Sequence, residues 1–148
     1  MEQEIFSDLL IQNQTTCWFA FNEINDENIC YRVNEQAASV GFIYRHVGEM
    51  MNMFGYFFGV STAVQNTTMG RQDEGQGKNL EESRQLVEKG YAMLQHVIDN
   101  TPAGAWLQPV ETPFFGTVSK ARLFSHVLYH NSHHAGQIGL SLKRGKPY

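Results

Sequence analysis

Residues 126–137 read HVLYHNSHHAGQ and contain four of the chain's six histidines. The stretch is predicted to be part of one helix, in which successive residues are about 100° apart. His130 and His134 then lie one turn apart on one face, while His126 and His133 share a flank. Four protonatable rings so close together would repel one another below their usual pKa of about 6.5. The cluster therefore indicates a role that offsets this repulsion, and two imidazoles one turn apart can hold one metal ion.

A third ligand for such a metal must come from another part of the chain, because catalytic metal sites normally use three protein ligands and leave one position open. His46 lies in the middle of a second predicted helix, among apolar residues, and is the best-placed remaining histidine. His96 is a weaker candidate. Since metal-binding histidines must be neutral, we expect metal binding to weaken as the pH falls through roughly 6.

Apolar residues recur at spacings of three and four in four segments of the chain, which predicts four helices. Asn79 is a plausible N-cap of the third helix, with Glu81 and Glu82 in the first turn, where negative charge is favourable. Thr117 or Ser119 can cap the fourth helix. The predicted helices cover about residues 2–23, 39–50, 80–100 and 117–143.

The connections between these helices differ in length. Residues 59–79 are rich in glycine, threonine, asparagine and charge, which predicts a long loop or lid. Residues 104–116 contain Pro109 and Pro113, which predict an irregular connection with a short extended piece. The 148-residue length fits one domain. We therefore expect a single all-α domain over residues 1–148, a four-helix bundle with a long connection after its second helix.

The charge of the chain limits its partners. The formal net charge is −4 and no stretch carries a run of lysine or arginine, so we expect no binding to nucleic acid. The first residues, MEQEIF, are acidic where a signal peptide would be basic. The apolar run around residues 50–60 is too short to span a bilayer. We therefore expect a cytoplasmic protein that does not enter the membrane.

An aromatic-rich stretch bears on the oligomeric state. Phe54, Tyr56, Phe57 and Phe58 follow one another closely, and their faces exceed what one small core can hide. This surplus of aromatic surface predicts a homodimer.

Two segments carry a resemblance to a known family. Residues 44–49, which read YRHVGE, and residues 126–138 resemble the DinB/YfiT-like superfamily. The resemblance covers nearly the whole chain and implies a four-helix bundle with a histidine-rich metal site. The family's three metal ligands correspond to His46, His130 and His134 here, with His133 as the competing choice for His134. Family members often have arginine after the adjacent histidine pair, where this chain has Ala135.

The resemblance also implies a chemistry. A divalent metal such as zinc or nickel, held by three imidazoles, would lower the pKa of a bound thiol or water toward neutrality. Family members resemble thiol-dependent transferases or isomerases that use a low-molecular-weight thiol, and others resemble metal-dependent hydrolases. Thiol transfer to a small-molecule substrate is favoured, because the sequence offers no convincing protein acid or base.

Two polar residues of the predicted site could assist this chemistry. Glu49, one turn after His46, could orient a ligand or accept a proton, although an exposed position on the helix is the competing interpretation. Gln137 could form a hydrogen bond within the site or pack between helices. The alternative function is a non-catalytic metal- or ligand-binding stress protein.

Overall fold

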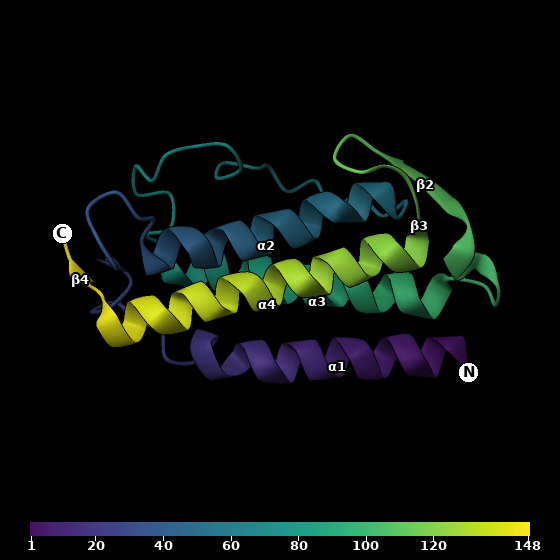
Figure 1. Ribbon diagram of the computed structural model, residues 1–148, viewed down its shortest axis with the longest axis horizontal. Helices are drawn as coiled ribbons and strands as arrows, with labels where there is room; N and C mark the ends of the chain where they lie inside the picture. The colour runs from purple at the N-terminus through teal and green to yellow at the C-terminus, as the bar shows by residue number, and fades with distance from the viewer.

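The computed structural model describes residues 1–148, and four long helices run side by side along its length (Figure 1). The predicted helical class is confirmed, since these helices account for most of the chain. The helices are α1 (Glu2–Phe21), α2 (Val40–Phe57), α3 (Leu80–Asn100) and α4 (Lys120–Arg144), with a 3-10 helix, η1 (Ala105–Leu107). Four short strands complete the fold, namely β1 (Tyr31–Arg32), β2 (Pro109–Thr112), β3 (Gly116–Ser119) and β4 (Lys146–Pro147).

Side-chain caps fix the starts of three helices. The Ser39 hydroxyl accepts a hydrogen bond from a first-turn amide of α2, and the Asn79 side chain does the same for α3. Ser119 caps α4, whereas Thr117, the other predicted cap, lies in β3. α2 ends at Phe57, seven residues beyond the predicted end of this helix. The helical spacing of apolar residues in its first part continues along the added residues, which pack into the core.

The core lies between the four helices. α2 packs against α3 and α4, and α1 packs against α4 and α3. Phe54 of α2 and Phe124 of α4 are among the largest fully buried side chains. Because α2 and α4 lie in direct contact, histidines that are far apart in the sequence can meet between them.

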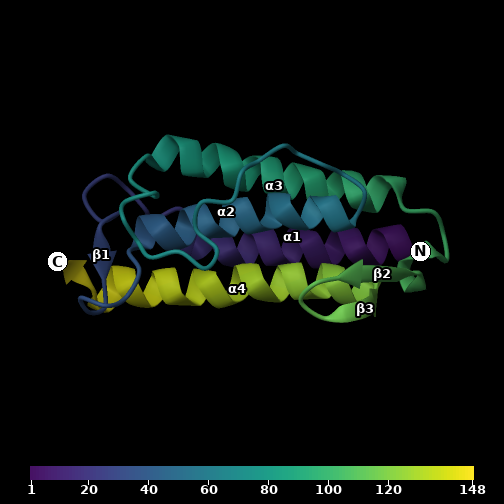
Figure 2. The same cartoon turned by 90° about the horizontal axis from the view of Figure 1, so that it is seen from above.

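The long connection between α2 and α3 is tied to both helices (Figure 2). Arg45 of α2 donates a hydrogen bond to the Thr67 hydroxyl, and Lys89 of α3 donates one to the carbonyl of Thr62. The predicted long connection is therefore present, and hydrogen bonds hold it against the helices.

The other predicted connection, residues 104–116, contains more regular structure than expected. β2 and β3 pair antiparallel from Pro109 opposite Ser119 to Thr112 opposite Gly116. Gly116 adopts a φ of 63°, which favours glycine in this turn. A second antiparallel pair, β1 with β4, ties the C-terminal end of the chain to residues 31–32.

The aromatic stretch of α2 is less exposed than the sequence suggests. Phe54 and Phe58 are buried and Phe57 is half-buried, so only Tyr56, at 73% exposure, faces outward. The expectation that the faces of these rings exceed what the core can hide is therefore wrong for Phe54 and Phe58, because α2 continues to Phe57 and the core takes up both rings. No helix of the chain combines the length and apolar character that crossing a membrane requires.

Candidate metal centre

Three histidine rings meet between α2 and α4. His46 comes from the middle of α2, and His130 and His134 come from successive turns of α4. The Nε2 atom of His130 lies 3.2 Å from Nε2 of His46 and 3.1 Å from Nε2 of His134. One nitrogen of each ring lies within 4.8 Å of the others. The structure thus brings together the three histidines that the sequence singled out.

The spacing of these nitrogens suits a shared metal ion. Zinc–nitrogen bonds of about 2.0–2.1 Å in a tetrahedral site place neighbouring donors about 3.3–3.4 Å apart. The two distances from His130, 3.1 Å and 3.2 Å, differ from this by only a few tenths of an ångström, and the donors of His46 and His134 lie within 4.8 Å of each other. Neutral imidazoles are good ligands for zinc, copper, iron and nickel. The residues present therefore fit a three-histidine site for a divalent transition metal.

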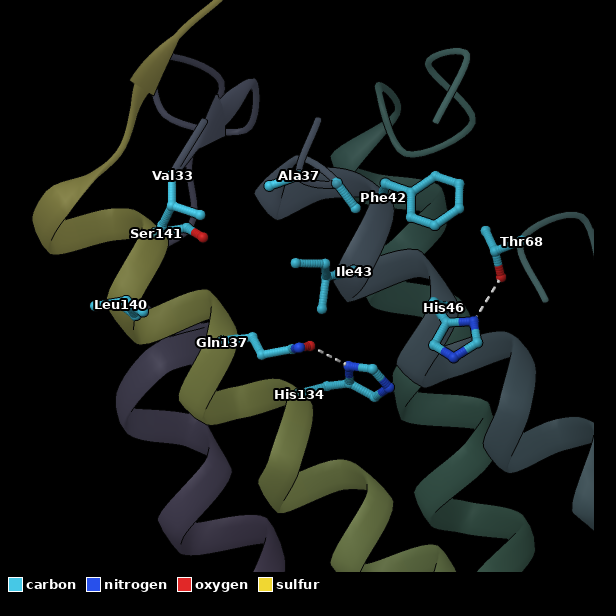
Figure 3. A pocket seen from close by; sticks show the side chains of 11 residues that line it. Val33, Ala37, Phe42, Ile43, His46, Thr68, His134, Gln137, Leu140 and Ser141 are labelled. Atoms are coloured by element: carbon cyan, nitrogen blue, oxygen red, sulfur yellow. Dashed lines mark hydrogen bonds between the residues drawn. The ribbon is translucent and has the colours of Figure 1, made fainter. Parts of the chain in front are cut away.

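A chain of hydrogen bonds fixes the orientation of the His46 ring. The Thr68 hydroxyl donates its only hydrogen to the carboxylate of Glu49, at 2.8 Å. It must therefore accept the bond from His46, whose Nδ1–H lies 3.0 Å from it (Figure 3). Because Nδ1 carries the hydrogen, the Nε2 lone pair of His46 faces the other two rings.

The His134 ring is held in the same way. Its Nδ1–H donates to the side-chain oxygen of Gln137, at 2.6 Å (Figure 3). Its Nε2 lone pair therefore faces the ring of His130. Two lone pairs aimed at one point need a positive or hydrogen-bonding partner there, and a metal ion supplies one.

The environment keeps these rings neutral. Burial, together with the nearby ring of His134, lowers the pKa of His46 to about 4. Burial and the surrounding histidines lower the pKa of His130 to about 3, and burial also lowers the pKa of His134. All three rings are therefore neutral at pH 7, the state that binds metals. Protons therefore compete with the metal at a lower pH than they would for exposed imidazoles.

Glu49 lies behind the histidines. Its side chain is only 1% exposed, so the interpretation of Glu49 as an exposed helix residue is wrong. Burial acts to raise its pKa, but hydrogen bonds from Thr67, Thr68 and Arg45 outweigh burial and lower the pKa. The carboxylate is therefore ionised at neutral pH. Hydrogen bonds connect it to the three histidines through the Thr68 hydroxyl, which bonds to His46.

The remaining histidines lie outside this centre. His133 is exposed and stacks on Tyr129, so the geometry favours His134 over His133 as the partner of His130. His126 packs against Phe115, with ring centroids 4.5 Å apart. His96 is exposed on α3, where it contacts Asn100.

Sequence reasoning missed Thr68. It lies in the connection after α2, 22 residues from His46, and is only 2% exposed. The connection has no repeating pattern that marks one threonine among its neighbours. The contact depends on how the connection folds back onto α2, so no signal in the sequence could have identified it.

A comparison with protein families gives one match. Residues 9–138 match the DinB superfamily, and this range includes the three clustered histidines, Glu49 and Thr68. No curated protein matches the chain. Since the family match covers most of the 148 residues, the chain belongs to the DinB superfamily.

Proposed function

We propose that the protein is a divalent-metal-dependent enzyme in which His46, His130 and His134 hold a zinc or nickel ion. The convergence of their three Nε2 atoms is the observation that carries this proposal. The reaction is the transfer of a low-molecular-weight thiol to a small-molecule substrate. The proposal takes residues 1–148 as one DinB-like domain whose four helices form a bundle, which agrees with the packing of α2 and α1 against their neighbours.

The surroundings of the three rings support a catalytic site. Three protein ligands leave a coordination position open, and a cavity of about 390 Å³ reaches His46 and His134. An ion held there would supply Lewis acidity, which lowers the pKa of a bound thiol or water. Thr68 and Gln137 orient two of the rings, and Glu49 acts through Thr68. We therefore propose Glu49 and Gln137 as positioning residues rather than as groups that exchange protons with a substrate.

The lining of the cavity favours thiol transfer over hydrolysis. Apart from His46 and His134, no side chain that lines it can ionise near neutral pH. Hydrolysis benefits from a general base that activates water, and no such base lines the cavity. A thiol, whose ordinary pKa is about 8.5, needs a far smaller lowering of its pKa by the metal than water does to become a nucleophile without a protein base. The lining thus agrees with a reaction in which the chain positions the reactants and the thiolate attacks.

Turnover measurements test this function. Zinc- or nickel-loaded protein is assayed with several cellular thiols against a panel of electrophiles, beside His130→Ala and the matched variant His133→Ala. We expect His130→Ala to lose at least about 100-fold in rate, since Lewis-acid activation contributes several kcal/mol. His133→Ala should keep its activity, because His133 is exposed and is not one of the three clustered histidines. If loaded wild-type protein never exceeds His130→Ala, the protein is a metal- or ligand-binding protein without catalytic activity.

We also propose a homodimer, with α1 in its interface. Ile11, Trp18 and Phe19 on α1 are 57%, 56% and 75% exposed. No charged residue occurs from Leu9 to Asn22. Interface centres are depleted of charged residues and enriched in aromatic ones, so this part of α1 fits an interface better than a solvated surface.

The mass in solution tests the homodimer. At micromolar concentration we expect light scattering to give twice the 16.9 kDa of one chain. Trp18→Glu should weaken association by roughly tenfold or more, because a buried tryptophan often dominates an interface. Tyr56→Glu, at an aromatic residue on α2 that is 73% exposed, serves as the control and should remain dimeric. A monomeric mass for wild-type protein would contradict the proposal.

A further inference from the structure

The cavity beside the three histidines has two chemically different ends. It lies between the N-terminal half of α2 and the C-terminal half of α4, and Val33, Ala37 and Ala38 from the segment before α2 form a third wall (Figure 3). His46 and His134 form one end. Phe42 and Ile43 of α2 and Leu140 of α4 supply most of the remaining apolar lining, and the uncharged side chains of Thr68, Gln137 and Ser141 also line the cavity. A ligand in the cavity would therefore meet metal-binding nitrogens at one end and hydrocarbon along its length.

No charged side chain lines this cavity. A carboxylate or phosphate placed in the cavity away from the metal-binding end would lose its hydration without gaining a counter-ion, which is costly. Arg32 and Arg71 line a separate hollow that shares only Ala37, Ala38 and Phe42 with the cavity. Arg32 is already paired with Asp73, at 3.1 Å. The lining thus selects against ligands that carry charge within the cavity.

The size of the cavity limits the ligand. Its volume of about 390 Å³ lies near the lower end of the range for small-molecule sites. At about 30 Å³ for each water-sized group, it has room for roughly a dozen non-hydrogen atoms. Leu140 at 55% exposure and Val33 at 38% stand at its edge, where a ligand would cover them.

We propose that this cavity binds the uncharged, apolar body of the substrate, an aliphatic or aromatic group of about a dozen non-hydrogen atoms. The donor or reactive atom of the substrate lies at the end formed by His46 and His134. This inference rests on the proposed function. It assigns the cavity to the electrophile, while any charged groups of the thiol stay outside.

A series of hydroxamates tests the proposal, because the head group binds zinc and only the tail varies. Acetohydroxamate, butanohydroxamate and hexanohydroxamate are titrated calorimetrically into zinc-loaded and metal-free protein. We expect the dissociation constant on zinc-loaded protein to fall roughly fourfold for each added methylene group. A hexanohydroxamate with a carboxylate at the far end of its tail should bind at least about tenfold more weakly than the uncharged compound.

A pair of variants locates the tail. Leu140→Glu adds a carboxylate at the edge of the cavity and should remove most of the gain from the longer tail, while acetohydroxamate binding stays unchanged. Ile5→Glu is the matched control, because Ile5 is 53% exposed and lies near the start of α1, and the N-terminal end of α1 and the C-terminal end of α4 lie at opposite ends of the molecule (Figure 1). Its affinities should equal those of wild-type protein.

The outcomes separate this inference from the proposed function. Zinc-dependent binding with no gain from tail length would overturn the apolar cavity and leave the metal site intact. Equal affinities with and without zinc, still rising with tail length, would overturn the metal site and support the apolar cavity. Binding that depends on neither zinc nor tail length would overturn both.

Discussion

Purified His130→Ala protein is expected to hold less than about a tenth of a zinc ion per chain, against one in wild-type protein. The Nε2 atom of His130 lies between those of His46 and His134, at 3.2 Å and 3.1 Å. Its removal leaves two donors, too few for the three-ligand site. We expect zinc affinity to fall by at least about 1,000-fold, more than the 10–100-fold that loss of an outer hydrogen-bond partner costs. Elemental analysis and chelator competition measure both quantities.

The cross-helix ligand and the control complete this test. His46→Ala removes the only ligand from α2 and should lose zinc as His130→Ala does, whereas His133→Ala should keep one ion per chain. Circular dichroism of the metal-free variants shows whether each remains folded. Full zinc content in His46→Ala would overturn the three-histidine site. Loss of zinc in His133→Ala would make His133 a ligand in place of His134.

The hydrogen bonds behind His46 predict a graded effect in the same titration. Thr68→Val keeps the shape of the side chain but removes the acceptor for His46 Nδ1–H and the donor to Glu49. Zinc affinity should fall by about 10–100-fold. Thr68→Ser restores the hydroxyl and should recover most of the affinity. If Thr68→Val binds zinc as wild-type protein does, Glu49 and Thr68 do not orient the ring.

The features that could be predicted from the sequence depend on local spacing. The i, i+4 relation of His130 and His134 is fixed by helix geometry alone, once the helix is recognised. The N-caps Ser119 and Asn79 act on amides three residues away, so residue type and position were enough to propose them. His46 could be chosen because few histidines remained elsewhere in the chain.

The features that could not be predicted depend on long-range packing. Glu49 looked like a surface residue because a helical pattern does not reveal that residues 67–68 fold over it and donate three hydrogen bonds. Phe54 and Phe58 looked like surplus aromatic surface until the packing of α2 buried them. The cavity is formed by four separate segments, so its uncharged lining has no counterpart in any one stretch of sequence.

Metal-free protein is expected to lose stability steeply as the pH falls from about 6.5 toward 4. In the folded protein, burial lowers the pKa of His46 to about 4 and that of His130 to about 3. In the unfolded chain both rings titrate near their usual pKa of about 6.5. Between these values the unfolded state binds more protons, so stability is full above pH 6.5 and is lost as the pH falls. The free energy of unfolding should change by at most about 1.4 kcal/mol per pH unit for each ring.

Urea unfolding of metal-free protein at pH 7, 6 and 5 measures this slope. Most carboxylates are ionised in both states at these pH values, so histidines determine the pH dependence. His130→Asn removes one buried ring and should make the slope shallower by about one proton. Equal stability of wild-type protein at pH 5 and pH 7 would contradict the expectation, because it would mean that the folded and unfolded states bind the same number of protons over this range.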